Sequence, residues 1–203
     1  MTVKDTVNFV VLSVNDLSEK TEESISMLQN AFFYNKLRFI EDARALTESI
    51  REKKDLLTAE LEEAAHDSPN LKVYISIPRH LERISDHIDK IAGNMASKIN
   101  EKILFSDKAM SEVTFLLQRT KEILNTMTDF ILARNTFIAI YLKESQQEIE
   151  RSATKFSTLH EDRLIEGLCT DKASGIFLNI LSSIKVIAWH TRQIAEELVT
   201  PVT

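Results

Sequence analysis

Three carboxylates that could bind a cation lie close together in the middle of the sequence, at Glu82, Asp86 and Asp89. Their spacings of four and three residues place them on one flank of an α-helix. Like charges four residues apart repel each other by about 0.2–0.5 kcal/mol in an isolated helix. A stripe of carboxylates therefore predicts a cation beside it, which could be an arginine, a lysine or a metal ion.

Two kinds of cation site remain open for Glu82 and Asp86. Carboxylates from two helices, completed by water, would suit Mg²⁺, Ca²⁺, Mn²⁺ or iron. The alternative is a network of ion pairs with the basic residues nearby in the sequence, Arg79, Arg83 and Lys90. His87 and His190 could also be ligands, but we expect them to pack at a helix edge or to bond a carbonyl.

The elements that position these residues are expected to be helices. The 203 residues include only three glycines and three prolines, where average usage would give roughly 14 and 10. Turn-rich β architectures need both residue types. Apolar residues instead recur at spacings of three and four along six stretches, 3–32, 37–64, 71–99, 109–131, 137–156 and 176–198.

Helix boundaries can be predicted from turn and capping residues. Ser68 and Pro69 suit a helix start, and Pro78 should kink the third helix or delay its regular beginning. A polar stretch over 160–170 is expected to be a connection, with Asp171 as the cap of the last helix.

The sequence divides into two similar halves. Tight breaks at Asn35 and Asn135 lie 100 residues apart, and three residues of the third helix align with three of the sixth at an offset of 103: His87, Ile91 and Ala92 with His190, Ile194 and Ala195. Three amphipathic helices can close a core. We therefore expect an all-α fold of six helices in two tandem antiparallel three-helix bundles, residues 1–104 and 105–203.

Composition limits the function classes. The net charge of −6 argues against nucleic acid as a partner. A single cysteine excludes an intrachain disulfide. The N-terminal apolar stretch is interrupted at Asn8, Ser13 and Asn15, unlike a signal peptide, and no run of 18 uncharged apolar residues occurs. We expect a cytoplasmic protein that reaches membranes only through partners.

One short segment resembles the PhoU family. Members carry a Glu-Arg-Ile-Gly-Asp-His signature late in each three-helix repeat, followed by Asn-Ile-Ala-Glu. This sequence reads Glu82-Arg83-Ile84-Ser85-Asp86-His87 and then Lys90-Ile91-Ala92-Gly93. The length and six-helix order are similar to the family's over the whole chain, so the resemblance implies the PhoU-like fold.

The resemblance also implies a metal site on the first repeat. PhoU-like proteins bind iron or other cations through this motif, so Mn, Mg or Zn are further possibilities. In the family, a second pair of acids lies on the middle helix of the repeat. The local residues are Glu48, Glu52 and Asp55, although the family's first acid aligns most simply with Arg51.

The second repeat departs from the motif. Lys185, Trp189 and Arg192 stand where the first repeat has Glu82, Asp86 and Asp89. A lysine supplies the charge that a metal would otherwise supply. Any metal is therefore expected on the first repeat only. The second should favour packing or the docking of an acidic partner, with Trp189 between the bundles.

The resemblance implies a regulator of phosphate transport and of phosphate-starvation signalling that acts through protein–protein contacts. Expected partners are membrane transporter components, a sensor histidine kinase, or a second copy in a homodimer. The sequence lacks the glycine loop and nucleophile elbow of common enzyme classes, so we expect no enzyme activity. The alternatives are an accessory partner of a secondary phosphate or cation transporter, and a metal-binding helical bundle.

Overall fold

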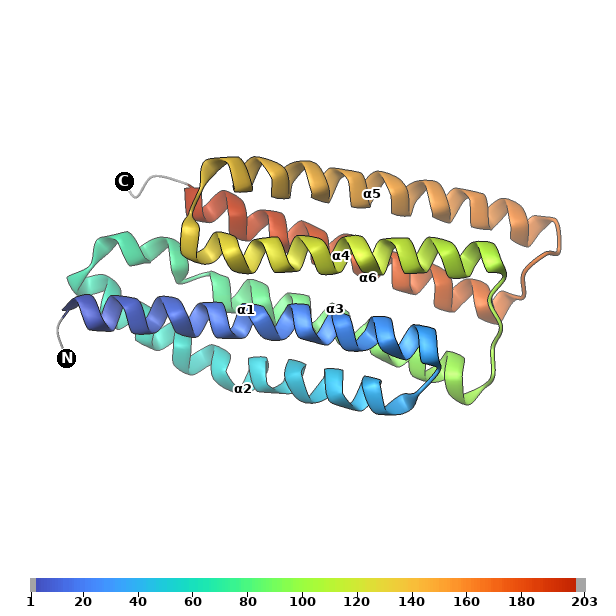
Figure 1. Ribbon diagram of the computed structural model, residues 1–203, viewed down its shortest axis with the longest axis horizontal. Helices are drawn as coiled ribbons and strands as arrows, with labels where there is room; N and C mark the ends of the chain where they lie inside the picture. The colour runs from blue at the N-terminus through green and yellow to red at the C-terminus, as the bar shows by residue number, and fades with distance from the viewer. Residues whose placement is uncertain (1–2, 200–203) are drawn as a thin grey trace.

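The computed structural model describes residues 3–199 and contains six α-helices and one short 3₁₀ helix (Figure 1). In chain order they are α1 Val3–Tyr34, α2 Leu37–Asp67, η1 Pro69–Tyr74, α3 Ile77–Asn100, α4 Asp107–Ala133, α5 Thr136–Ile165 and α6 Asp171–Val199. No β-strand occurs between residues 3 and 199. The predicted all-α fold class is confirmed.

The helices form two elongated three-helix bundles that lie side by side (Figure 1). Helices α1, α2 and α3 pack on one another, as do α4, α5 and α6. The bundles meet where α1 packs on α4 and where α3 and α6 pack on each other. Helices α2 and α5 are the outer ones, because within residues 3–199 neither contacts a helix of the other bundle. One face of each is therefore open to solvent.

A single apolar core runs through both bundles. It includes Ile25 and Ile84 of the first bundle and Ile184 of the second, each fully buried. The predicted division at residues 104 and 105 falls in the connection between α3 and α4. These domain limits stay a prediction, and their ends at residues 1 and 203 lie outside the described residues.

Both predicted tight breaks are present, and each depends on a left-handed residue. Asn35 has φ of 51° and donates its N–H to Ala31 O at 2.9 Å, which ends α1. Arg134 has φ of 47° and ends α4, and the Asn135 side chain accepts the N–H of Phe137 at 2.8 Å to begin α5.

The regular third helix begins next to Pro78 and not at Ser68 and Pro69. Ser68 and Pro69 open only the short η1, and the Ser68 side chain makes no capping bond. Helix α3 begins at Ile77 with Pro78 in its first turn. Proline is tolerated there because the first N–H groups of a helix have no intrahelical acceptor. The expected delay of the regular helix is thus observed.

The predicted connection over 160–170 is shorter than expected. Helix α5 continues to Ile165, and His160 is 1% exposed because its Nε2 bonds Ser174 Oγ at 2.9 Å and its ring stacks on Phe177. The residue that caps α6 is Thr170 and not Asp171, since Thr170 Oγ1 accepts the Ala173 N–H at 3.3 Å.

Helix α6 is the one helix of the described residues long and apolar enough to cross a membrane, with a mean hydropathy of 1.2 over its most apolar window. It packs on α3, α4 and α5, and residues such as Ile180 and Ile187 are fully buried. Its place in the core accounts for its apolar character.

Candidate functional site

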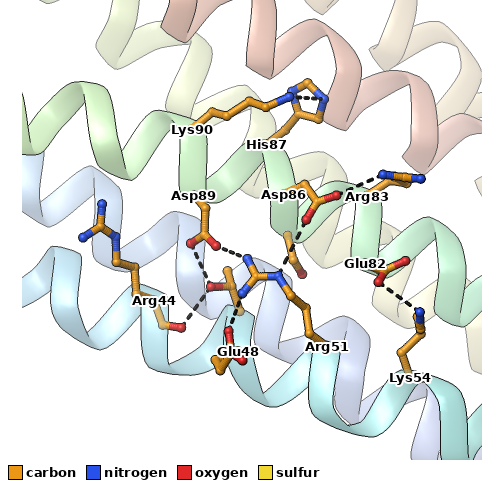
Figure 2. A network of polar contacts seen from close by, with 12 residues as sticks. Arg44, Glu48, Arg51, Lys54, Glu82, Arg83, Asp86, His87, Asp89 and Lys90 are labelled. Carbon is orange, nitrogen blue, oxygen red and sulfur yellow. Dashed lines mark hydrogen bonds and ion pairs between the residues drawn. The ribbon is translucent and has the colours of Figure 1, made fainter.

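The carboxylate stripe of α3 faces the middle helix of its own bundle. Leu81, Ile84 and Ile88 are fully buried, which fixes the rotation of α3 about its axis. Glu82, Asp86 and Asp89 consequently lie along the edge of the core, next to α2 (Figure 2). The stripe is partly buried, with side-chain exposures of 23% to 33%.

Arg51 of α2 lies at the centre of the acids. Its Nη1 donates to Glu48 Oε2 at 2.6 Å, and its Nε lies 3.6 Å from Asp86 Oδ1. Its Nη2 donates to Asp89 Oδ2 (Figure 2). The other Asp89 oxygen accepts the hydroxyl of Thr47 at 2.8 Å. One guanidinium therefore serves three carboxylates, as its planar set of five donors allows.

Lys54, one turn further along α2, holds the next acid. Its Nζ lies 3.0 Å from Glu82 Oε1 and 3.0 Å from Asp55 Oδ1, and hydrogen bonds to Asp55 and Glu82 raise the pKa of the lysine. Arg83 Nη1 reaches Asp86 Oδ2 at 3.3 Å. We call these contacts of Arg51, Lys54 and Arg83 with the acids the ion-pair network.

The structure brings together most of the predicted ligand set. Glu48, Glu82, Asp86 and Asp89 all belong to the network. Asp55 joins only through Lys54, with a side chain 88% exposed. Glu52 is exposed and has no ion partner within residues 3–199. Of the three basic residues predicted to pair with the stripe, Arg83 does so.

A metal centre fits this arrangement poorly. Divalent cations need several oxygen or nitrogen ligands around one point. Within residues 3–199, no three His, Cys, Asp or Glu side chains are grouped closely enough to hold one. The Arg51 guanidinium lies between acids of the two helices, so a metal would have to displace it. The ion-pair alternative is favoured by this geometry, and the metal site stays a prediction.

The sequence analysis did not place Arg51 and Lys54 in the site. A signal was nevertheless available, because the family's first middle-helix acid aligns with Arg51. An arginine at that position places a fixed positive charge where a metal ligand was expected. The sequence analysis also overlooked Thr47, which is fully buried next to Asp89.

Comparison with known proteins agrees with the motif. Residues 14–95 match the PhoU domain model, a range that includes the ion-pair network. This part of the chain is a PhoU domain. No curated protein matches the sequence.

The PhoU fold extends beyond the matched domain. The crystal structure of PhoU from Pseudomonas aeruginosa superimposes with a TM-score of 0.88 at 16% identity, covering 98% of this chain and 97% of that one. The phosphate transport system regulatory protein PhoU from Streptococcus pneumoniae gives a TM-score of 0.86 at 14% identity, covering 98% and 95%. The second repeat, which the domain model does not match, thus keeps the fold.

A second polar cluster joins the two bundles. His80 of α3 and His190 of α6 approach with their Nδ1 atoms 2.8 Å apart, and His80 Nε2 lies 3.1 Å from Glu197 Oε1. Ser76 Oγ donates to the other oxygen of Glu197. We call His80, His190 and Glu197 the histidine seam. Trp189 lies beside it, with its ring centroid 4.7 Å from that of His190 and 6.5 Å from that of His80.

The two facing nitrogens of the seam can share only one proton. Burial, and then the electrostatic effect of His80, lower the pKa of His190 to about 4, so that the His190 imidazole is neutral at pH 7. The hydrogen bonds from His80 and Ser76 lower the pKa of Glu197 against the opposing effect of burial, which is the largest single influence. The sequence analysis identified His190 but not its partner His80, which lies 110 residues away in the sequence.

Proposed function

We propose that this chain regulates phosphate transport by binding other proteins, and that it is not an enzyme. One observation supports the proposal above others: the PhoU domain at residues 14–95 is part of a whole-chain likeness to PhoU structures, one of them a phosphate transport system regulatory protein. Identities of 14% and 16% make the step from fold to function an inference.

The proposed action is docking by helix faces in the cytoplasm. The outer helices α2 and α5 each leave one face uncovered by the rest of the chain. The expected partners are components of a membrane transporter and a sensor histidine kinase, which this chain would reach without crossing the membrane itself. Binding through such a face would regulate the partner by favouring the conformation of the partner that the face binds better.

Deletion of the gene tests the proposal. A phosphate-starvation reporter should become active in phosphate-rich medium when the chain is absent, and a plasmid copy of the chain should restore repression. A reporter that stays silent in rich medium and responds normally in poor medium would refute the proposal. Altered cation uptake with a normal reporter would point to the secondary-transporter alternative.

A further inference from the structure

The outer side of the second repeat contains a hollow between α5 and α6. Its volume is about 370 Å³, and it is lined by Gln146 and Glu150 of α5 and by Ser182, Lys185, Trp189 and His190 of α6. A neighbouring hollow on α5 shares Glu150 and adds Arg151 and Lys155. We call the two together the basic hollow.

The cations of the basic hollow are unpaired. Lys185, Arg151 and Lys155 make no ion pair or hydrogen bond within residues 3–199. The contrast with the first repeat is clear, since Arg51 and Lys54 there are neutralised by acids of the same bundle. These basic side chains of the second repeat are therefore available to an external anion, whereas Arg51 and Lys54 of the first repeat are paired with acids of their own bundle.

The one acidic side chain in the lining does not neutralise Lys185. The Glu150 carboxylate accepts the Gln146 amide at 2.8 Å and has no salt bridge within residues 3–199. Arg192, the other basic residue at a motif position, is paired with Glu196 at 2.8 Å. Lys185 is thus the basic motif residue that remains available to an external anion.

Trp189 gives the hollow an apolar wall. The indole is 46% exposed, although it is among the largest apolar surfaces a side chain can offer. Tryptophan is enriched at the hot spots of protein–protein interfaces. His190 lies beside it and is held by His80 in the histidine seam.

We propose that the basic hollow binds an acidic segment of a partner protein, with a carboxylate on Lys185 and an apolar side chain on Trp189. Charge complementarity favours this occupant. Arg151 and Lys155 extend the positive surface along α5, which suits a chain with several carboxylates better than one small anion. This deepens the proposed function by assigning a docking face, and rests on it for the partner's cellular role.

Trp189 makes the proposal directly testable, because it is the only tryptophan of the chain. The probe is a short fluorescein-labelled peptide of glutamate and leucine, titrated into the full chain. We expect its anisotropy to rise and the Trp189 emission to change with the same binding curve. Binding should weaken as salt is added, because exposed charges are screened.

Charge reversals locate the site. Lys185→Glu together with Arg151→Glu should weaken binding about tenfold, equivalent to about 1.4 kcal/mol. Arg151→Glu alone, at an exposed position, should retain the fold and still weaken binding. Lys108→Glu, an exposed control in the first turn of α4, should change the affinity less than about twofold.

Several outcomes would overturn the proposal. These are an unchanged Trp189 emission, an equal loss with the Lys108 control, or equal binding of a lysine–leucine peptide. A response of Trp189 to phosphatidylserine vesicles but not to the acidic peptide would assign the hollow to a membrane instead. Failure of peptide binding with a constitutive reporter in the deletion strain would reject the docking face and leave the regulatory function standing.

Discussion

At the scale of single residues, basic side chains of α2 neutralise the carboxylate stripe of α3. Carboxylates at Glu82, Asp86 and Asp89 need a positive charge, and α2 supplies it with Arg51 and Lys54. Partly exposed ion pairs contribute roughly 0.2–1 kcal/mol each. Each contact of the ion-pair network therefore adds little to total stability.

Removing the guanidinium should allow the acids around it, which are not grouped closely enough to hold a metal in the structure, to move together around a cation. We expect Arg51→Ser to bind Mn²⁺ more tightly than the unchanged chain, because Glu48, Asp86 and Asp89 then lack their shared counter-charge. Isothermal titration calorimetry with Mn²⁺ measures the affinity. Adding Glu82→Ala and Asp86→Ala to that variant should abolish the gain.

Two results would contradict this expectation. Tight Mn²⁺ binding by the unchanged chain, lost in the Glu82→Ala, Asp86→Ala double variant, would establish the metal site predicted from the sequence. No difference between Arg51→Ser and the unchanged chain would show that the acids are too far apart to share a metal. Lys185→Ala, on the second repeat, serves as the control.

At the scale of elements, α3 contains a glycine that its geometry does not require. Gly93 stands where the family motif has an acid, and a Cβ added there would meet only Arg44 Nη2, at 3.9 Å. That distance is ordinary van der Waals contact. Glycine inside a helix costs roughly 0.5–1 kcal/mol relative to alanine, because it loses more conformational freedom on folding.

Gly93→Ala should therefore raise the free energy of unfolding by about 0.5–1 kcal/mol, measured by urea denaturation. The matched control is Gly167→Ala, in the connection after α5. Gly167 has φ of +73°, which alanine adopts only with strain, so this variant should lose about 1 kcal/mol. A loss of stability with Gly93→Ala would indicate that the space between Gly93 and Arg44 is too small for a methyl group.

At the scale of the whole molecule, the two bundles are joined by an apolar core and by polar contacts within it. Ser18 of α1 bonds Thr128 of α4 at 2.8 Å, and Tyr74 donates to Ile131 O at 3.0 Å. The histidine seam adds a titratable contact between α3 and α6. Acid should weaken the histidine seam, because protonation of both facing Nδ1 atoms would place two N–H groups opposite each other.

The free energy of unfolding should fall as pH decreases from about 6.5 to about 4. The unfolded chain binds a proton at the ordinary histidine pKa of about 6.5, whereas His190 in the folded chain does so only near 4. Unfolding thus takes up a proton in this window. Between pH 7 and pH 5, this one group should remove about 1–2 kcal/mol, allowing for its partial exposure.

His190→Gln should flatten this pH dependence by the same amount, as measured by urea denaturation at the two pH values. His66→Gln is the control, since His66 is exposed at the end of α2. Burial also lowers the pKa of His87 and of His160, so a weaker dependence of the same sign should remain in the variant. Equal slopes for His190→Gln and the unchanged chain would contradict the assignment.

The sequence by itself determined the helices, their order and the breaks at Asn35 and Asn135. Apolar periodicity and capping residues act over a few neighbouring positions, so Asn35 and Asn135 could be assigned as turns without knowledge of the fold. The same local information identified the carboxylate flank of α3. It also identified the reversed charge at Lys185, because the residue type at a motif position can be read directly from the sequence.

Only the tertiary structure decided which cation each acid meets. Arg51 is 38 residues from Asp89, and their contact depends on the rotation of two packed helices, which no local pattern encodes. His160 was predicted to lie in a connection because it is polar, yet Ser174 and Arg163 satisfy its ring nitrogens and allow burial. The pairing of His80 with His190 likewise arises only where the two bundles pack together.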